Sequence, residues 1–289
     1  MTNSAPVILD FDGSLGTVAG ATEIPLQDWQ EKIRFGCSLK NFQSLVRLLQ
    51  QRMPAEHGTV LLGSGDFHHL TWPLVQRCQS RGPFQVVLFD NHPDNMRFPF
   101  GIHCGSWVRQ VALLPYVSHV HVLGVTSPDI SLSSAWQQYW RPLLSGKVTY
   151  WCTDVDVRWA SWFGLKKSFR RFDNPDELIE SFISTQTAMP TYLTIDKDVL
   201  SADAVATNWD QGRMLESHLV SVIRSLKGNI IGSDITGDVS SWLYTTWWKR
   251  KLSALDGQTG IPAARLLEWQ HDHQALNARL IARIAENSV

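Results

Sequence analysis

Short apolar runs alternate with segments of helical periodicity along nearly the whole chain, and this alternation constrains the fold more than any other feature. The runs show little polar alternation, which is typical of strands buried on both faces of a parallel sheet. We expect strands at 6–11, 59–62, 85–90, 119–125, 148–152, 192–196 and 229–232. Helical patterns occupy 38–49, about 174–185, 211–227 and a last segment from Pro262 towards 284.

Strands that alternate with helices predict an α/β fold with helices on both faces of a parallel sheet. No stretch rich in Pro, Gly and Ser is long enough to divide the chain, so we expect one α/β domain over residues 1–289. In sheets of this kind ligands bind beyond the carboxyl ends of the strands. Those ends are therefore where candidate site residues should be sought.

Charge and cysteine usage exclude several classes of protein. The chain has 26 Lys and Arg against 27 Asp and Glu, a balance that argues against a general nucleic-acid binder. Four scattered Cys without a CxxC pair predict a reduced protein, and with no signal-peptide pattern we expect it to be cytoplasmic. No apolar run approaches the roughly 18 residues that would cross a membrane.

Three of the expected strand ends are rich in metal-ligand side chains. The block at 63–71 contains His68 and His69, the block at 89–94 reads Phe-Asp-Asn-His-Pro-Asp, and the block at 194–198 reads Thr-Ile-Asp-Lys-Asp. In extended chain alternate side chains share one face, so the Asp and His side chains within each of the last two blocks can converge. We therefore expect the three blocks to form one polar cluster.

Such a cluster needs a compensating cation, because buried charges must be paired or coordinate a metal. A carboxylate can bridge two ions, so four Asp and two His could hold a pair of divalent metals. Carboxylate-rich ligation favours Mn²⁺ over thiolate-preferring ions, while the imidazoles leave Zn, Fe, Co or Ni open. The sequence therefore predicts a dinuclear site of this chemistry.

The three blocks resemble the signature blocks of the arginase/agmatinase/formimidoylglutamase family, the ureohydrolases. That family has a Gly-rich block ending in His, a D-x-H-x-D block and a D-x-D block, in this order, and the spacing is similar across about 60–240. The resemblance implies a single three-layer α/β domain with a central parallel sheet. It also implies two Mn²⁺ ions that activate a bridging hydroxide, a small guanidino or amidine substrate, and a homo-oligomer.

Carried over by position, the resemblance assigns roles to the residues of the blocks. Asp90 and Asp196 match the bridging carboxylates, and a single histidine of the Gly-rich block would be a ligand, His68 or, if the register slips by one, His69. The implied metal ligands are His68, Asp90, His92, Asp94, Asp196 and Asp198.

The implied chemistry is attack of hydroxide on an amidine or guanidinium carbon, which cleaves a non-peptide C–N bond. Asp94 or His103 would then pass a proton to the leaving amine. His103 lies where the family often keeps a histidine near the substrate, and imidazole titrates near neutral pH.

The sequence departs from the family pattern most clearly in its late block. The family usually supplies there a Glu that grips the guanidinium, whereas Gly237 occupies that position and Asp238 is the nearest carboxylate. Asp238 is therefore the candidate substrate ligand, by a shift of one residue. Lys197 also stands where the family usually has an aliphatic residue.

Two other functions remain open at this point. The altered substrate block and the abundance of Trp are compatible with a catalytically inactive member of the fold that binds metal or a partner. Separately, the segment 8–15 resembles the first motif of haloacid-dehalogenase-type phosphatases, in which Asp10 would be the nucleophile and Asp12 the general acid, with Mg²⁺. The phosphatase interpretation leaves the blocks around Asp90 and Asp196 unexplained.

Overall fold

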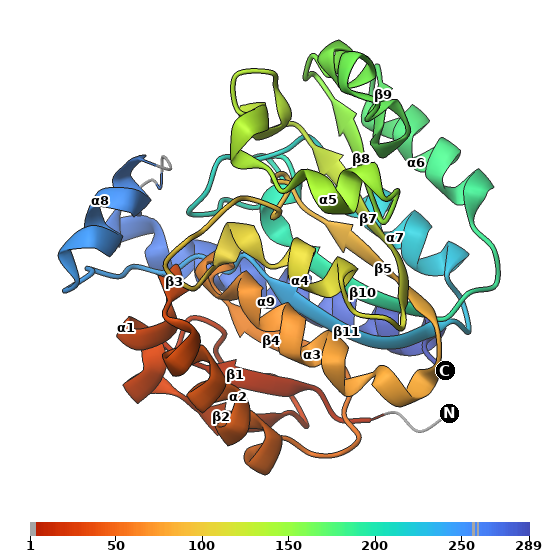
Figure 1. The fold of residues 1–289 in the computed structure, drawn as a ribbon. Helices are drawn as coiled ribbons and strands as arrows, with labels where there is room; N and C mark the ends of the chain where they lie inside the picture. Colours follow the sequence, from red (N-terminus) through yellow and green to blue (C-terminus); the bar gives the residue numbers. More distant parts are fainter. Residues whose placement is uncertain (1–3, 256–257, 259) are drawn as a thin grey trace.

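A twisted parallel sheet of nine strands forms the centre of the computed structural model, which describes residues 4–255, 258 and 260–289 (Figure 1). The strand order is β2-β1-β4-β11-β10-β5-β7-β8-β9. The strands are β1 (Val7–Asp10), β2 (Thr22–Pro25), β4 (Val60–Gly63), β5 (Phe84–Phe89), β7 (Val117–Val125), β8 (Val148–Thr153), β9 (Phe169–Phe172), β10 (Thr191–Asp196) and β11 (Ile230–Thr236). A separate antiparallel pair joins β3 (Gly36–Cys37) to β6 (Ile102–His103).

Helices cover both faces of the sheet and give three layers (Figure 1). They are α1 (Gln30–Ile33), α2 (Leu39–Arg52), α3 (Thr71–Arg77), α4 (Val108–Ala112), α5 (Trp140–Leu144), α6 (Pro175–Thr185), α7 (Glu216–Ser225), α8 (Trp247–Leu255) and α9 (Ala263–Asn287). One apolar core joins the sheet to α2, α3, α4 and α5, and a second core on the opposite face joins it to α6, α7 and α9. The expected α/β architecture is therefore confirmed.

Local signals explain several element boundaries. The Ser38 side chain accepts a hydrogen bond from the Asn41 backbone N–H at 3.3 Å and so caps α2. Asn174 caps α6 in the same way, with Pro175 at the first helical position. The expected helices at 38–49, 174–185 and from Pro262 onward are thus present, while the helix expected at 211–227 is shorter, at Glu216–Ser225.

The sheet topology brings the ends of four strands together. β4, β11, β10 and β5 are consecutive neighbours in the middle of the sheet, and all their pairings are parallel. Their carboxyl ends therefore meet at one edge, followed in the chain by the residue blocks that the sequence singled out. None of the helices in the part of the chain that the structure describes is long and apolar enough to cross a membrane.

Candidate metal centre

Side chains at the carboxyl ends of β4, β5 and β10, or just after them, form a first group of ligand atoms. His68 Nδ1 lies 3.0 Å from Asp94 Oδ2, 3.3 Å from Asp90 Oδ2 and 3.4 Å from Asp196 Oδ2. All four residues are buried, and His68, Asp90 and Asp94 offer ligand atoms close enough to hold one ion. The arrangement brings together the residues of the three separate sequence blocks.

A second group lies beside the first and shares Asp90 with it. His92 Nδ1 is 2.9 Å from Asp198 Oδ2 and 3.6 Å from Asp90 Oδ1, and Asp90, His92 and Asp198 could also hold an ion. The two oxygens of Asp90 therefore face different groups. Asp90 Oδ2 is buried and has no hydrogen-bond partner, so this donor set fits a pair of cations bridged by a carboxylate.

The charges of the cluster are poorly balanced by the chain alone. Burial raises the pKa of Asp94 and of Asp198 to about 6, and the neighbouring Asp90 charge adds to the effect. Burial and the adjacent Asp198 raise the pKa of Asp196 well above its usual value. Bound divalent cations would favour the ionised carboxylates in place of protons.

The two histidines respond to the same surroundings in the opposite direction. Burial alone would lower the pKa of His68 and His92, but the facing carboxylates raise both well above the usual value. In turn the histidines hold the pKa of Asp90 at about 2, against the effect of its burial. The site therefore gathers negative charge around two imidazoles, which is the donor chemistry of a hard or borderline divalent metal.

The contact of His68 Nε2, the ring nitrogen away from the carboxylates, determines which nitrogen carries the hydrogen. The Thr194 hydroxyl donates to Asp234 Oδ1 at 2.6 Å, which uses its single hydrogen, so it can only accept from His68 Nε2 at 3.2 Å. Nε2 thus carries the hydrogen, and in the neutral ring Nδ1 keeps a lone pair that faces the carboxylates. Sequence reasoning missed Thr194, although it lies two residues before Asp196 on the same strand face.

Asp94 is held in an unusual backbone conformation. Its φ is +47°, a left-handed value that residues other than Gly adopt uncommonly. The Trp107 indole N–H donates to Asp94 Oδ2 at 2.6 Å, on the same oxygen that faces His68. The contact fixes this carboxylate inside the cluster, in line with the constrained conformations found at functional sites.

The structure places His68, and not His69, among the carboxylates. His69 is fully buried on the other side of the 3-10 turn Gly65–Leu70, where its ring packs near Phe42 with centroids 5.8 Å apart. Burial lowers the pKa of His69 well below its usual value, so the ring is a neutral core residue. The turn geometry therefore selects between the two adjacent histidines.

His103 lines the cavity over the metal centre. Its Nδ1 accepts a hydrogen bond from the Gly105 backbone N–H at 3.0 Å, and its ring stacks on Phe98. The cavity has a volume of about 440 Å³ and also includes Trp209 and Leu255 in its wall. His103 therefore lies in the wall of the same cavity as the cluster.

Asp238 lies elsewhere, contrary to the expectation that it would meet the substrate. Its carboxylate is 0% exposed and pairs with Lys197 Nζ at 2.7 Å, and the Asn277 amide donates to it at 2.9 Å. Asp238 is not among the residues that line the cavity. The reason is that β11 turns at Gly237 and directs the next side chain away from the cluster, toward α9.

Gly237 itself has no room for a side chain. Its φ is +86°, and a Cβ there would lie 2.7 Å from the Lys197 backbone N and closer still to Asp196 Oδ1. The position where the family resemblance places a Glu therefore cannot carry one without displacing a cluster carboxylate. The packing around Gly237 therefore accounts for the absence of the family's Glu at this position.

Asp10 and Asp12, the candidate phosphatase residues, form other contacts. Asp10 accepts hydrogen bonds from the Gly13 backbone N–H and from the Gln27 amide, at a turn after β1. Asp12 forms a 2.9 Å ion pair with the buried Arg34. Neither residue lines the cavity, so the phosphatase interpretation receives no support from this geometry.

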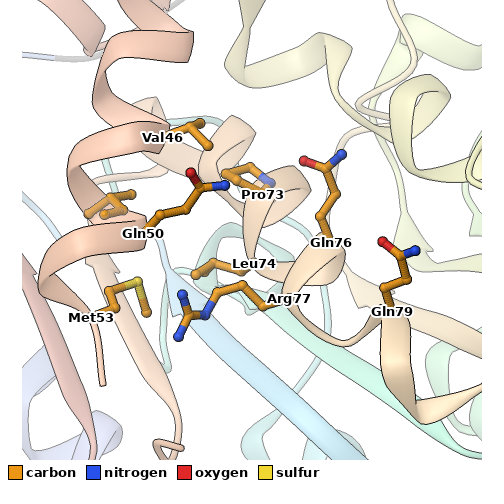
Figure 2. A pocket seen from close by; sticks show the side chains of 9 residues that line it. Val46, Gln50, Met53, Pro73, Leu74, Gln76, Arg77 and Gln79 are labelled. Carbon is orange, nitrogen blue, oxygen red and sulfur yellow. The ribbon is translucent and has the colours of Figure 1, made fainter. Parts of the chain in front are cut away.

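A second hollow lies between α2 and α3 and is of a different kind (Figure 2). Figure 2 shows Val46, Gln50 and Met53 on the α2 side, and Pro73, Leu74 and Arg77 on the α3 side. Its described lining contains no Asp, Glu, His or Cys. The chemistry-bearing residues therefore converge on the first cavity.

Comparisons with known proteins find similarity to one family. The family model described as "Arginase family" matches residues 17–237 of the chain. An uncharacterized protein of Thermotoga maritima is 27% identical over 191 residues, which is 66% of this chain and 62% of that protein. The chain thus matches less than two thirds of the length of this relative.

Solved structures show the same fold. An arginase from Medicago truncatula superimposes with a TM-score of 0.57 at 14% identity, covering 98% of this chain and 87% of that chain. A proclavaminate amidino hydrolase from Streptomyces clavuligerus gives a TM-score of 0.52 at 14% identity, covering 98% and 93%. The three-layer architecture expected from the resemblance is confirmed.

Proposed function

Because the chain belongs to the arginase family, we propose that it is a dinuclear metal-dependent hydrolase that cleaves a C–N bond of a small amidine or guanidino compound. The observation that carries the proposal is the pair of ligand groups, His68/Asp90/Asp94 and Asp90/His92/Asp198, which share one carboxylate. A buried carboxylate that both groups share, with one oxygen that has no hydrogen-bond partner, supports a position between two neighbouring cations.

The proposed cofactor is a pair of divalent ions, Mn²⁺ being favoured by four carboxylates and two imidazoles. The first ion would be held by His68 and Asp94, the second by His92 and Asp198, with Asp90 and Asp196 between them. When bound, such ions lower the pKa of a water molecule toward neutrality and so supply hydroxide. The chain's own part is to orient the ligands and to move the proton.

His103 is the proposed group that hands a proton to the leaving amine, with Asp94 as the alternative. Since His103 Nδ1 accepts from the Gly105 N–H, the hydrogen of the neutral ring lies on Nε2. What supports this role is that His103 lines the cavity over the metal centre, with Nε2 3.7 Å from the Cys104 Sγ.

The charge of the cavity wall bears on the substrate. None of the described residues that line it is Lys or Arg, and Asp129 and Asp210 add carboxylates to those of the metal centre. A substrate carboxylate would therefore find no Lys or Arg side chain among the described residues of the wall. We expect agmatine and guanidine to be cleaved faster than arginine, guanidinobutyrate and formiminoglutamate, which all bear a carboxylate.

The test is a substrate screen of the Mn²⁺-loaded protein with those five compounds. Release of urea, amide and ammonia is measured, and Asp90→Asn, which removes the shared carboxylate, is the control. The proposal predicts turnover of at least one compound that disappears in the control. Two bound metals with no turnover of any amidine would identify an inactive member of the family instead.

A further inference from the structure

We propose that Asp210 is a positioning residue that holds the His92 ring so that its Nδ1 faces the metal centre. This inference rests on the two-metal site proposed above. Asp210 lies in the connection between Asp198 and α7, outside the residue blocks that carry the family resemblance. The connection has no regular secondary structure over 207–212, and the segment is called the 207–212 loop below.

The contact between Asp210 and His92 bears on which ring nitrogen carries the hydrogen. His92 Nε2 lies 2.8 Å from Asp210 Oδ1, while Nδ1 of the same ring lies 2.9 Å from Asp198 Oδ2. Both ring nitrogens therefore face a carboxylate, which only accepts hydrogen bonds, and a cation bound at Nδ1 would leave the ring hydrogen on Nε2, where Asp210 accepts it. Nδ1 is then the nitrogen that can give its lone pair to a cation, as in other carboxylate–histidine–metal arrangements.

Asp210 is itself held by a residue of the metal block. The Asn91 amide, between Asp90 and His92 in the chain, donates to Asp210 Oδ2 and to the Asp210 carbonyl, each at 3.1 Å. The Asn91 backbone N–H donates to Asp198 Oδ1 at 3.0 Å. Both oxygens of Asp210 are therefore engaged, one by the ring and one by Asn91.

The rest of the 207–212 loop is anchored at each side of Asp210. Asn208 exchanges two hydrogen bonds with the Ser240 backbone, at 2.8 and 2.9 Å. The Gln211 amide donates to two carbonyl groups, Leu200 O and Val205 O. The Gly212 N–H donates to the Asp198 carbonyl at 2.7 Å, where a Cβ would lie 2.5 Å from the Val199 carbonyl oxygen. The loop is built to keep Asp210 in one place.

The two histidines of the centre are thus supported in different ways. His68 is held by the buried, neutral hydroxyl of Thr194, whereas His92 is held by a carboxylate that is 56% exposed. Loss of the Asp210 carboxylate should therefore weaken the metal position built on His92 and leave the position built on His68. A residue that only stabilised the fold would weaken both positions together.

The test measures metal affinity rather than activity. Asp210→Ala, Asp210→Glu and the wild-type protein are titrated with Mn²⁺ against a chelating dye, and bound metal is counted per chain. Asp129→Asn is the matched control, because it also removes a carboxylate from the cavity wall. Thermal unfolding of each metal-free protein reports whether the fold is intact.

We expect Asp210→Ala to keep one Mn²⁺ site at wild-type affinity and to weaken the other by about 10- to 100-fold, the usual effect of removing a partner of a ligating histidine. Asp210→Glu should recover most of the lost Mn²⁺ affinity, and Asp129→Asn should bind Mn²⁺ as the wild type does. Equal affinities in Asp210→Ala and Asp129→Asn would overturn the inference, as would an equal weakening of both sites. If the wild type binds fewer than two ions, the proposed metal centre fails as well; inactivity in the substrate screen alone would not affect the inference.

Discussion

Replacing Lys197 by Met should destabilise the protein strongly, because it leaves a buried carboxylate without its counter-charge. Lys197 Nζ contacts Asp238 Oδ1 at 2.7 Å and the Asn277 amide oxygen at 2.9 Å. Both side chains of the ion pair are 0% exposed, and a second Asp238 oxygen has no hydrogen-bond partner. Burial lowers the pKa of Lys197 and raises that of Asp238, while their mutual attraction opposes both shifts.

The expected cost follows from this burial. Breaking a buried pair by removing one partner costs about 3–5 kcal/mol, since the remaining charge is neither solvated nor paired. The double variant Lys197→Met/Asp238→Asn removes both charges and keeps an acceptor for Asn277. The double variant should therefore have a higher free energy of unfolding than Lys197→Met, although it carries one more substitution.

Urea unfolding of the metal-free proteins, followed by Trp fluorescence, gives the free energies of unfolding. The four proteins of the cycle are the wild type, the two single variants and the double variant. A loss below about 1 kcal/mol for Lys197→Met, the scale of an exposed ion pair, would refute the reasoning. A wild-type free energy of unfolding for Asp238→Asn, together with a raised KM, would instead return Asp238 to the substrate-binding role.

Two further predictions concern a glycine and a glutamate. Gly237→Ala should lower the free energy of unfolding by more than about 1 kcal/mol and weaken Mn²⁺ binding, because its Cβ would collide with Asp196. Gly228→Ala is the matched control, since Gly228 also has a positive φ, +73°, but has open space around the position of a Cβ. Equal metal affinity in the two variants would contradict the reasoning. Glu31 accepts from the Trp242 indole at 2.9 Å, and hydrogen bonds of this kind outweigh its burial and lower its pKa from 4.5 to about 2. Glu31→Gln should therefore have a lower free energy of unfolding than the wild type above pH 4.5, and this difference should shrink as the pH falls toward 2. A difference in the free energy of unfolding that does not depend on pH would be evidence against this.

The sequence predicted the sheet well where strands are buried on both faces. The central strands β4, β5, β7, β8, β10 and β11 were all expected, because continuous apolar runs mark them. Two strands at the edges were missed: β2 has three exposed residues of four, and β9 reads Phe-Arg-Arg-Phe. Short edge strands carry polar side chains and lack the apolar signal.

Residue spacing brought the metal-ligand candidates together but could not settle their surroundings. The choice between His68 and His69 depends on the 3-10 turn after β4, which no periodicity predicts. The role of Asp238 depends on Lys197, and here a signal was present, because a lysine at a buried strand end needs a carboxylate partner. Asp210 lies in irregular chain, where neither strand nor helix spacing places a side chain.

The most direct test of the central claim is the number of Mn²⁺ ions bound per chain. The wild-type protein, loaded with Mn²⁺ and passed through gel filtration, is analysed by elemental analysis and by electron paramagnetic resonance. The shared carboxylate predicts two ions per chain with an exchange-coupled signal, and the double variant Asp90→Asn/Asp196→Asn should lose that coupled pair. A single uncoupled ion in the wild type, or a coupled pair that survives the double change, would contradict the account.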